Sequence, residues 1–406
     1  MNNEKTIPIS LLIALIGFPQ ISETIYTPAL PSVAAGLQAS AYIVETTLSI
    51  YFLGFALGVL IWGTISDYLG RRTAMLAGIF VYGIGTLGCA LAQNVEALLA
   101  WRFLQAFGAS VGSVITQTIL RDSYSGTEQT KIFSVLTGAI AFSPALGPIL
   151  GGFISEFWGW RANFWILVLF AFCLSIFTFS FLPETRPANI VRLSAKKTAS
   201  LLLQMIGVRT LWGHILLIGA TNGILFGFYQ EAPFIFIEQL QIAPSFYGLF
   251  GLLIATATIV AAKISYQKNH IFSPQAFIQW GALCVLLGAF LFMIFVLFEI
   301  LNTTVMGMGA TILTLFLIFF GVGLIIPNSL SNALKAYKHA AGTAGSIFGG
   351  FYYCLIAIFT WLISLLHNGT AWPLPLYFII LGIILIIGSK MVCSKYLDQK
   401  PHSAMA

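Results

Sequence analysis

Long apolar stretches follow one another along the whole chain, and short polar segments separate them. A helix needs about 20 apolar residues to cross the hydrocarbon core of a bilayer. Continuous runs of this length exclude membrane-spanning β-strands, which alternate apolar and polar residues. The sequence therefore predicts an all-α membrane protein with 12 transmembrane helices, at 7–29, 42–63, 74–93, 97–119, 131–154, 161–181, 211–231, 245–265, 274–298, 303–327, 342–366 and 373–393.

The longest connection follows the sixth apolar stretch and is polar and basic at its start. We therefore expect an N-terminal six-helix bundle over 1–182, a cytoplasmic linker over 183–210, and a C-terminal six-helix bundle over 211–406 that ends in a short cytoplasmic tail. Composition agrees, because 58% of the residues are hydrophobic and only 8% are charged. A soluble domain has about 25% charged residues.

The 19 Lys and Arg residues are distributed unevenly among the connections. All but two of them lie on the side of the membrane where the chain begins. Arg161 lies in a connection on the other side, and Arg102 lies inside an apolar stretch. By the positive-inside rule, both termini are expected in the cytoplasm, with the protein in a bacterial-type inner membrane. The net charge of +6 is then a topology signal, so we expect no nucleic-acid partner.

The connection between the second and third stretches reads GTISDYLGRR, residues 63–72. A tight turn at the membrane face favours glycine, an acid can pair with a helix N-terminus or a base, and arginines anchor the turn at the interface. The residues in question are Gly63, Asp67, Gly70, Arg71 and Arg72.

The fifth stretch contains GAIAFSPALGPILGG, residues 138–152. Small residues on one side of a helix let a neighbouring helix approach closely, and Pro148 can bend the helix. The glycines of this motif are Gly138, Gly147, Gly151 and Gly152. The eleventh stretch repeats the pattern in GTAGSIFGGFYY, residues 342–353. We therefore expect close-packed, bendable helices at equivalent places in the two halves.

These motifs, together with LLAWRFLQAFGA at 98–109, resemble the signature motifs of the major facilitator superfamily. VETTLSIYFLGFALG at 44–58 and EAPFIFIEQLQIAPSFYGLFG at 231–251 resemble its Bcr/CflA drug-resistance branch, which contains drug:proton antiporters. The resemblance implies rocking of two six-helix halves, with the proton gradient as the energy source and no cofactor. It also implies that Asp67 and Arg71 join Arg121 in a cytoplasmic gate cluster.

Glu23 is a carboxylate inside the first apolar stretch. A charge at mid-membrane costs at least ~2.5 kcal/mol, and an acid can avoid that cost by taking up a proton. A proton carrier needs this behaviour. Arg102, in the same half, is the expected electrostatic partner. In the branch pattern the acid stands four residues before Pro28, where this chain has Thr24, so the acid lies one position earlier here.

Few other polar groups lie inside the apolar stretches. Those expected to face a central cavity are Tyr26, Gln117, Asn222 and Tyr229. Glu45 and Glu231 lie at the outer ends of their stretches, and we expect them to be solvated. No cluster of metal ligands, no nucleophile with a base and no phosphate-binding loop is recognisable, so we expect neither a metal site nor an enzyme.

The leading hypothesis is a monomeric, proton-coupled exporter of amphiphilic drugs or toxic compounds. The alternative is a dedicated metabolite or siderophore transporter on the same fold, with import as an open direction, and substrate profiling separates the two. A third class, a membrane sensor or scaffold without transport, would need no acid and arginine inside the membrane.

Overall fold

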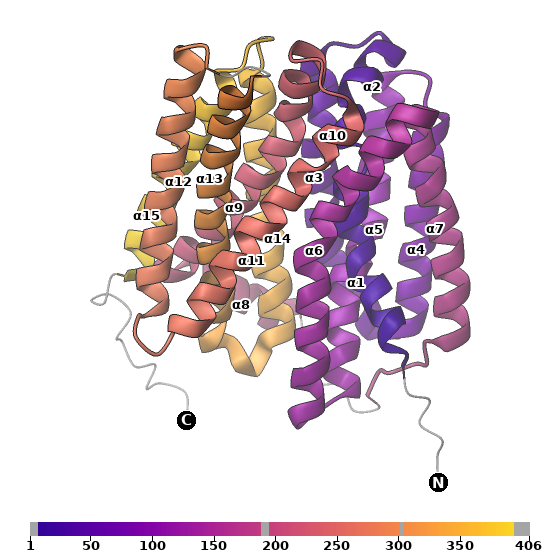
Figure 1. Cartoon of the computed structure of the whole chain (residues 1–406). Coiled ribbons are helices and arrows are strands. Elements are labelled where there is room, and N and C mark those ends of the chain that lie inside the picture. Colours follow the sequence, from indigo (N-terminus) through magenta and orange to yellow (C-terminus); the bar gives the residue numbers. More distant parts are fainter. Residues whose placement is uncertain (1–6, 188–194, 301–303, 394–406) are drawn as a thin grey trace.

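The computed structural model describes residues 7–187, 195–300 and 304–393. The predicted cytoplasmic tail beyond 393 and residues 188–194 of the predicted linker lie outside the described residues. Within the described part the chain is helical and contains no strand (Figure 1). The predicted all-α membrane fold is therefore confirmed, and the exact limits of the linker stay a prediction.

The N-terminal half consists of long helices that run across the molecule (Figure 1). They are α1 (Ile9–Thr24), the 3₁₀ turn η1 (Thr27–Ala29), α2 (Leu30–Leu37), α3 (Ala41–Leu69), α4 (Arg71–Leu91), α5 (Val95–Ser123), α6 (Gly126–Trp158) and α7 (Trp160–Phe181). Pro28 and Pro31 occupy first-turn positions of η1 and α2, where a missing N–H is tolerated. The first span therefore continues to Leu37 instead of ending at its prolines.

The C-terminal half repeats the arrangement. Its elements are α8 (Ala195–Ile206), α9 (Arg209–Pro233), the π-helical turn η2 (Phe234–Gln239), α10 (Pro244–Gly248), α11 (Phe250–Lys268), α12 (Pro274–Leu297), α13 (Val305–Ala333), the 3₁₀ segment η3 (Lys335–Ala340), α14 (Ala341–Leu366) and α15 (Pro373–Cys393). The short helix α8 lies in the connection that was expected to be only a linker.

Each of the twelve predicted segments falls on one of these long helices or helix pairs. Within the described residues, eleven spans are long and apolar enough to cross a membrane. The remaining predicted span, 131–154, lies within the 33-residue helix α6, which stands alongside the others (Figure 1). The observed helices extend beyond most predicted segments because helices can continue into the polar interface, where apolar patterning gives no signal.

The two halves meet along two seams. Helix α14 packs along α3, and α6 packs against α10 and α11. Glycines make this contact close: a Cβ at Gly350 would lie 2.7 Å from Leu60 Cδ2, and one at Gly152 would lie 2.3 Å from the Pro244 carbonyl oxygen. The two glycine-rich helices, α6 and α14, were expected at equivalent places in the two halves, and each lies on one of these seams.

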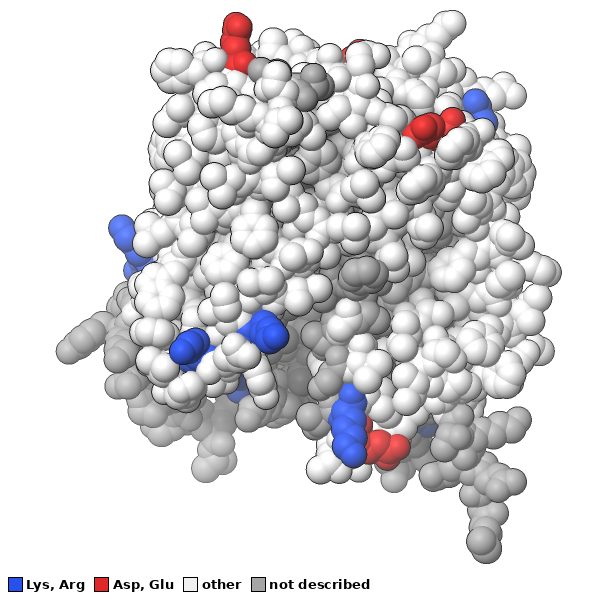
Figure 2. Space-filling model, in the orientation of Figure 1, with Lys and Arg blue, Asp and Glu red and all other residues white. Residues whose placement is uncertain are grey.

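The two ends of the molecule differ. Lys and Arg gather at the end where α1 begins and α15 ends, which we call the basic end, and Figure 2 shows a notch between the halves there. Gly138 lies on the basic-end half of α6, and a Cβ at this position would meet no atom within 4 Å. At the opposite end, α6 touches α10 through Gly152. The structure is therefore closed at the opposite end and open toward the basic end.

Candidate substrate and proton site

Glu23 lies in the last turn of α1 and is 1% exposed. The two following residues pack against α6, because a Cβ at Gly147 would lie 1.9 Å from Thr24 Oγ1 and one at Gly151 would lie 1.5 Å from the Ile25 carbonyl oxygen. One residue corresponds to about 100° around a helix, so Glu23 points away from this contact. Its Oε1 atom has no hydrogen-bond partner in the described part of the chain.

The surroundings of Glu23 come from both halves of the molecule. In the N-terminal half, Arg102 on α5 and Tyr51 on α3 lie within electrostatic range of its carboxylate. In the C-terminal half, Tyr352 and Tyr353 on α14 lie within the same range. The carboxylate is therefore placed where a relative movement of the halves would change its environment.

Arg102 is fully buried and held by aromatic rings. Its guanidinium carbon lies 4.2 Å from the ring centroid of Tyr26 and 4.2 Å from that of Tyr51. Nη1 donates to Gln105 Oε1 at 2.6 Å and to the Ser22 carbonyl at 3.4 Å. Cation–π contacts of this kind are worth about 2 kcal/mol when desolvated.

Glu23 and Arg102, which were expected to be electrostatic partners, make no direct ion pair in this structure. No side-chain nitrogen of Arg102 lies within 4.0 Å of a Glu23 oxygen, although the two residues interact over a longer distance. Nε and Nη2 of Arg102 have no hydrogen-bond partner among the described residues. The guanidinium therefore keeps two donors that an anion or a moving carboxylate could engage.

A network of four residues ties Arg102 to α1 and α4, and the sequence did not predict it. Gln105 Nε2 donates to Thr86 Oγ1 at 3.0 Å, Thr86 donates to the Tyr82 carbonyl at 2.7 Å, and the Tyr82 hydroxyl lies 2.5 Å from Ser22 Oγ. Only the three-residue spacing of Arg102 and Gln105 signals this network, since such residues share a helix face.

The other cavity candidates are not brought to this site, with the exception of Tyr26. Asn222 donates to the Ile218 carbonyl of its own helix, and Tyr229 is buried with its hydroxyl unbonded among the described residues. Gln117 is partly buried on α5, and its carbonyl accepts from Arg121. Their role in a cavity stays a prediction.

The predicted gate motif forms a cluster at the basic end. Arg71 makes an ion pair with Asp67 and a second one, at 2.9 Å, with Asp122 of α5. Arg121 instead donates to a backbone carbonyl of its own helix. In this structure Asp122 therefore joins Asp67 in binding Arg71, because the side chain of Asp122 faces α4. The expected inclusion of Arg121 in the gate cluster stays a prediction.

Gly70 and Glu184 shape the same turn. Gly70 has a φ of +96°, which a residue with a Cβ rarely adopts, and a Cβ there would lie 2.3 Å from Glu184 Oε2. The Glu184 carboxylate accepts hydrogen bonds from the backbone N–H groups of Arg71 at 2.8 Å and Arg72 at 3.2 Å. It caps the N-terminus of α4, and its negative charge interacts favourably with the positive end of the helix dipole there. Gly63 does not belong to this turn. It faces α14, where a Cβ at Gly63 would lie 3.3 Å from Ser346 Oγ.

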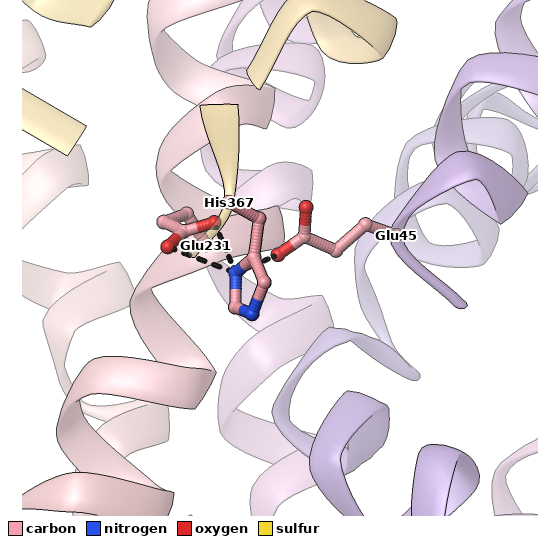
Figure 3. Close-up of side chains that lie close together, drawn as sticks. All are labelled: Glu45, Glu231 and His367. Carbon is pink, nitrogen blue, oxygen red and sulfur yellow. Dashed lines mark hydrogen bonds and ion pairs between the residues drawn. The ribbon is translucent and has the colours of Figure 1, made fainter. Parts of the chain in front are cut away.

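At the opposite end, Glu45, Glu231 and His367 converge, which corrects the expectation that the two acids are solvated (Figure 3). Both carboxylates are 0% exposed. His367, just beyond the last residue of α14, contacts both through Nδ1. Burial by itself would lower the pKa of His367, but its hydrogen bonds with Glu231 and Glu45 outweigh burial and raise the pKa to about 10. Sequence reasoning missed His367 because nothing near it in the chain signals the two acids.

Comparisons with known proteins show what this chain is similar to. The family model described as Major Facilitator Superfamily matches residues 12–360. An uncharacterized transporter of Rickettsia bellii (strain RML369-C) is 39% identical over 385 residues, which are 93% of this chain and 94% of the relative. A chloramphenicol resistance protein of Pseudomonas aeruginosa is 30% identical, covering 89% of this chain and 84% of the relative.

A more distant relative is multidrug resistance protein D of Escherichia coli (strain K12), which is 28% identical with 93% of each chain covered. Among solved structures, a D-xylose-proton symporter superposes with a TM-score of 0.77 at 14% identity, covering 95% of this chain and 97% of the symporter. That likeness concerns the fold alone. Since the family model spans most of the chain and close relatives cover nearly all of it, the protein belongs to the Major Facilitator Superfamily of membrane transporters.

Proposed function

We propose that this transporter exports amphiphilic drugs or toxic compounds by antiport with H⁺. The proton gradient supplies the energy without a cofactor, and the protein works as a monomer in the bacterial inner membrane with both termini in the cytoplasm. Relatives named for resistance to chloramphenicol and to several drugs support the substrate class. The concentration of Lys and Arg at one end supports the orientation, with the basic end in the cytoplasm (Figure 2).

The observation that carries the proposal is the buried, incompletely bonded carboxylate of Glu23 between the halves. In a closed, apolar environment an isolated carboxylate is favoured in its protonated form, and when water reaches it the ionised form is favoured. Rocking of the halves would therefore load and unload a proton at this residue. Arg102 stands close enough to favour release of the proton, and an anionic group of a substrate could compete for its free donors.

Aromatic side chains of both halves that pack together near the middle of the molecule favour binding of an apolar substrate. The ring centroids of Phe52 and Phe226 lie 4.4 Å apart, and those of Phe55 and Tyr353 lie 4.5 Å apart, so rings of both halves meet here. Pockets for drug-sized ligands are mostly apolar and aromatic, with few polar groups that fix orientation. On opening, these rings would separate and offer apolar faces to a compound of variable shape.

We further propose that the basic-end cluster is the inner gate. Arg71 links α4 to α3 through Asp67 and to α5 through Asp122. A rigid turn at this position gives the inner ends of α3 and α4 a fixed surface against which the other half can close. That closure would accompany the outward-open state, which is the opposite of the state in this structure.

The test uses purified protein in liposomes with a pH dye inside and a panel of unrelated lipophilic compounds. We expect several compounds to drive proton movement. Glu23→Gln, which keeps the shape of the side chain and removes its titration, should abolish proton movement with each compound while insertion and folding persist. Glu96→Gln, an exposed acid in the first turn of α5, is the matched control and should transport normally.

Unchanged proton movement in Glu23→Gln would remove this residue from the mechanism. Proton movement with a single compound would favour a dedicated transporter over a multidrug exporter. Uptake into right-side-out vesicles along the proton gradient would reverse the proposed direction.

A further inference from the structure

The cluster of Glu45, Glu231 and His367 joins the two halves at the closed end. Glu45 is in the second turn of α3, in the N-terminal half. Glu231 is near the end of α9, and His367 follows α14, both in the C-terminal half. Figure 3 shows the three side chains pointing toward one common place from these three elements.

The donor atoms have the separations of ligands around one metal ion. His367 Nδ1 lies 3.0 Å from Glu231 Oε2 and 3.2 Å from Glu45 Oε1. One ligand atom of each residue lies within 4.8 Å of the others. With metal–ligand bonds of 2.0–2.2 Å, two ligands of a tetrahedral ion stand about 3.3 Å apart. Small rotations of the side chains would therefore admit an ion without moving the helices.

The carboxylate of Glu45 is an independent sign that a ligand is expected here. It is 0% exposed; its Oε1 has only the 3.2 Å contact with His367 Nδ1, and its Oε2 has no hydrogen-bond partner among the described residues. A buried polar atom without a partner destabilises the fold, and a charged one does so more strongly. Two buried acids facing a single histidine also leave negative charge in excess whenever both are ionised. A divalent cation would satisfy both the oxygens and the charge.

We propose that Glu45, Glu231 and His367 bind a divalent transition-metal ion, with Zn²⁺ as the best fit, and that the bound ion clamps the outer end of the transporter shut. One imidazole and two carboxylates resemble the three-ligand sets of zinc sites that keep a fourth position open. Ca²⁺ and Mg²⁺ fit poorly because they prefer six or more oxygen ligands. The His367 side chain is 12% exposed, which gives an ion a route from the outer side.

The three ligands lie in both halves of the molecule, so a bound ion would link the halves. An ion held by α3 on one side and by α9 and the end of α14 on the other would resist separation of the halves, so the outward-open state would be disfavoured. This part of the inference rests on the proposed alternating access. The metal site itself does not, and the two are tested separately.

The site is tested by calorimetric titration of the metal-stripped full-length protein with ZnCl₂, after removal of any affinity tag. We expect one ion per chain. His367→Asn and Glu45→Gln should each raise the Kd by at least about 100-fold, since even outer-shell changes cost 10–100-fold. His270→Asn, an exposed histidine between α11 and α12, is the control and should leave the Kd unchanged.

If a variant fails to fold, zinc X-ray absorption spectroscopy on the unmutated protein identifies the ligands of the bound ion. We expect one imidazole and carboxylate oxygens at about 2.0–2.2 Å. Absence of binding, a spectrum without imidazole, or equal binding by His367→Asn would overturn the site.

The clamp is tested in liposomes by adding Zn²⁺ at the outer face. It should slow transport by the unmutated protein and leave His367→Asn unaffected. Tight binding without slowing would overturn the clamp and keep the site. A protein that binds Zn²⁺ but moves no compound of the panel would overturn the proposed export, and the titration would still establish the metal site.

Discussion

At the scale of single residues, the proposed site depends on Arg102 more than on any direct ion pair. Its guanidinium is flat and lies between two rings, and its hydrogen bonds go to Gln105 and a backbone carbonyl. This arrangement holds a positive charge near Glu23 without neutralising it through contact. A lysine could carry the same charge but neither stack in this way nor present a planar set of donors.

Arg102→Lys should therefore impair both folding and transport. We expect the free energy of unfolding to fall by about 2 kcal/mol, the value of a desolvated cation–π contact, and proton-coupled transport to be lost. Thermal melting in detergent and the liposome assay measure the two effects. Arg121→Lys is the control for stability, because Arg121 is exposed and its Nε donates to a carbonyl of its own helix; a change beyond about 0.5 kcal/mol there is not expected. Normal transport by Arg102→Lys would contradict the role of the guanidinium.

At the scale of elements, glycines decide how closely helices approach. Gly147 and Gly151 of α6 touch the end of α1 beside Glu23, whereas Gly138 of the same helix meets nothing. Although all three belong to one sequence motif, they therefore have different structural roles. The contact of α6 with α1 sets where Glu23 points, so packing and the proposed chemistry are coupled here.

Gly151→Ala and Gly138→Ala should have effects of opposite sign on stability. At Gly151 the added Cβ would overlap the Ile25 carbonyl, at 1.5 Å, and overpacking of this kind costs about 1–3 kcal/mol or more. At Gly138 the added methyl group has room, and alanine stabilises a helix by up to about 1 kcal/mol relative to glycine. Melting temperatures in detergent distinguish the two variants, and equal shifts would show that α6 and α1 are not in close contact at Gly151.

The turn between α3 and α4 offers a second test at this scale. Asp122 is 16% exposed and Asp67 is 43% exposed, so the pair of Arg71 with Asp122 is the less hydrated one. Asp122→Asn should therefore destabilise the protein by about 2 kcal/mol, the value of a charge-assisted hydrogen bond, and Asp67→Asn by less. The same melting assay applies. A larger effect of Asp67→Asn would indicate that the cluster is built around the exposed acid.

At the scale of the whole molecule, the structure is closed at one end and notched at the basic end (Figure 2). The two seams, α3 with α14 and α6 with α10 and α11, place the contacts between halves at equivalent helices. Such a pair of seams permits rocking without disrupting either bundle. The proposed orientation makes the open end cytoplasmic, so a compound would enter from inside the cell.

The orientation predicts the behaviour of C-terminal fusions. Green fluorescent protein fused after Ala406 should fluoresce, and alkaline phosphatase at the same position should be inactive, because its disulfides form only outside the cytoplasm. Phosphatase fused after Gln241, at the opposite end, should be active. The reverse pattern would invert the topology and with it the direction proposed for transport.

The sequence by itself determined the number and order of the membrane spans, the excess of positive charge at one end and the family motifs, because span length, charge distribution and turn chemistry are local properties. Only the tertiary structure decided which side chains meet. Glu231 and His367 are 136 positions apart, and Glu45 comes from the other half of the molecule. Asp122, and not the neighbouring Arg121, makes the second ion pair with Arg71 for the same reason. Helix rotation and tilt set these contacts, and uniformly apolar helices carry no periodic signal that reveals either.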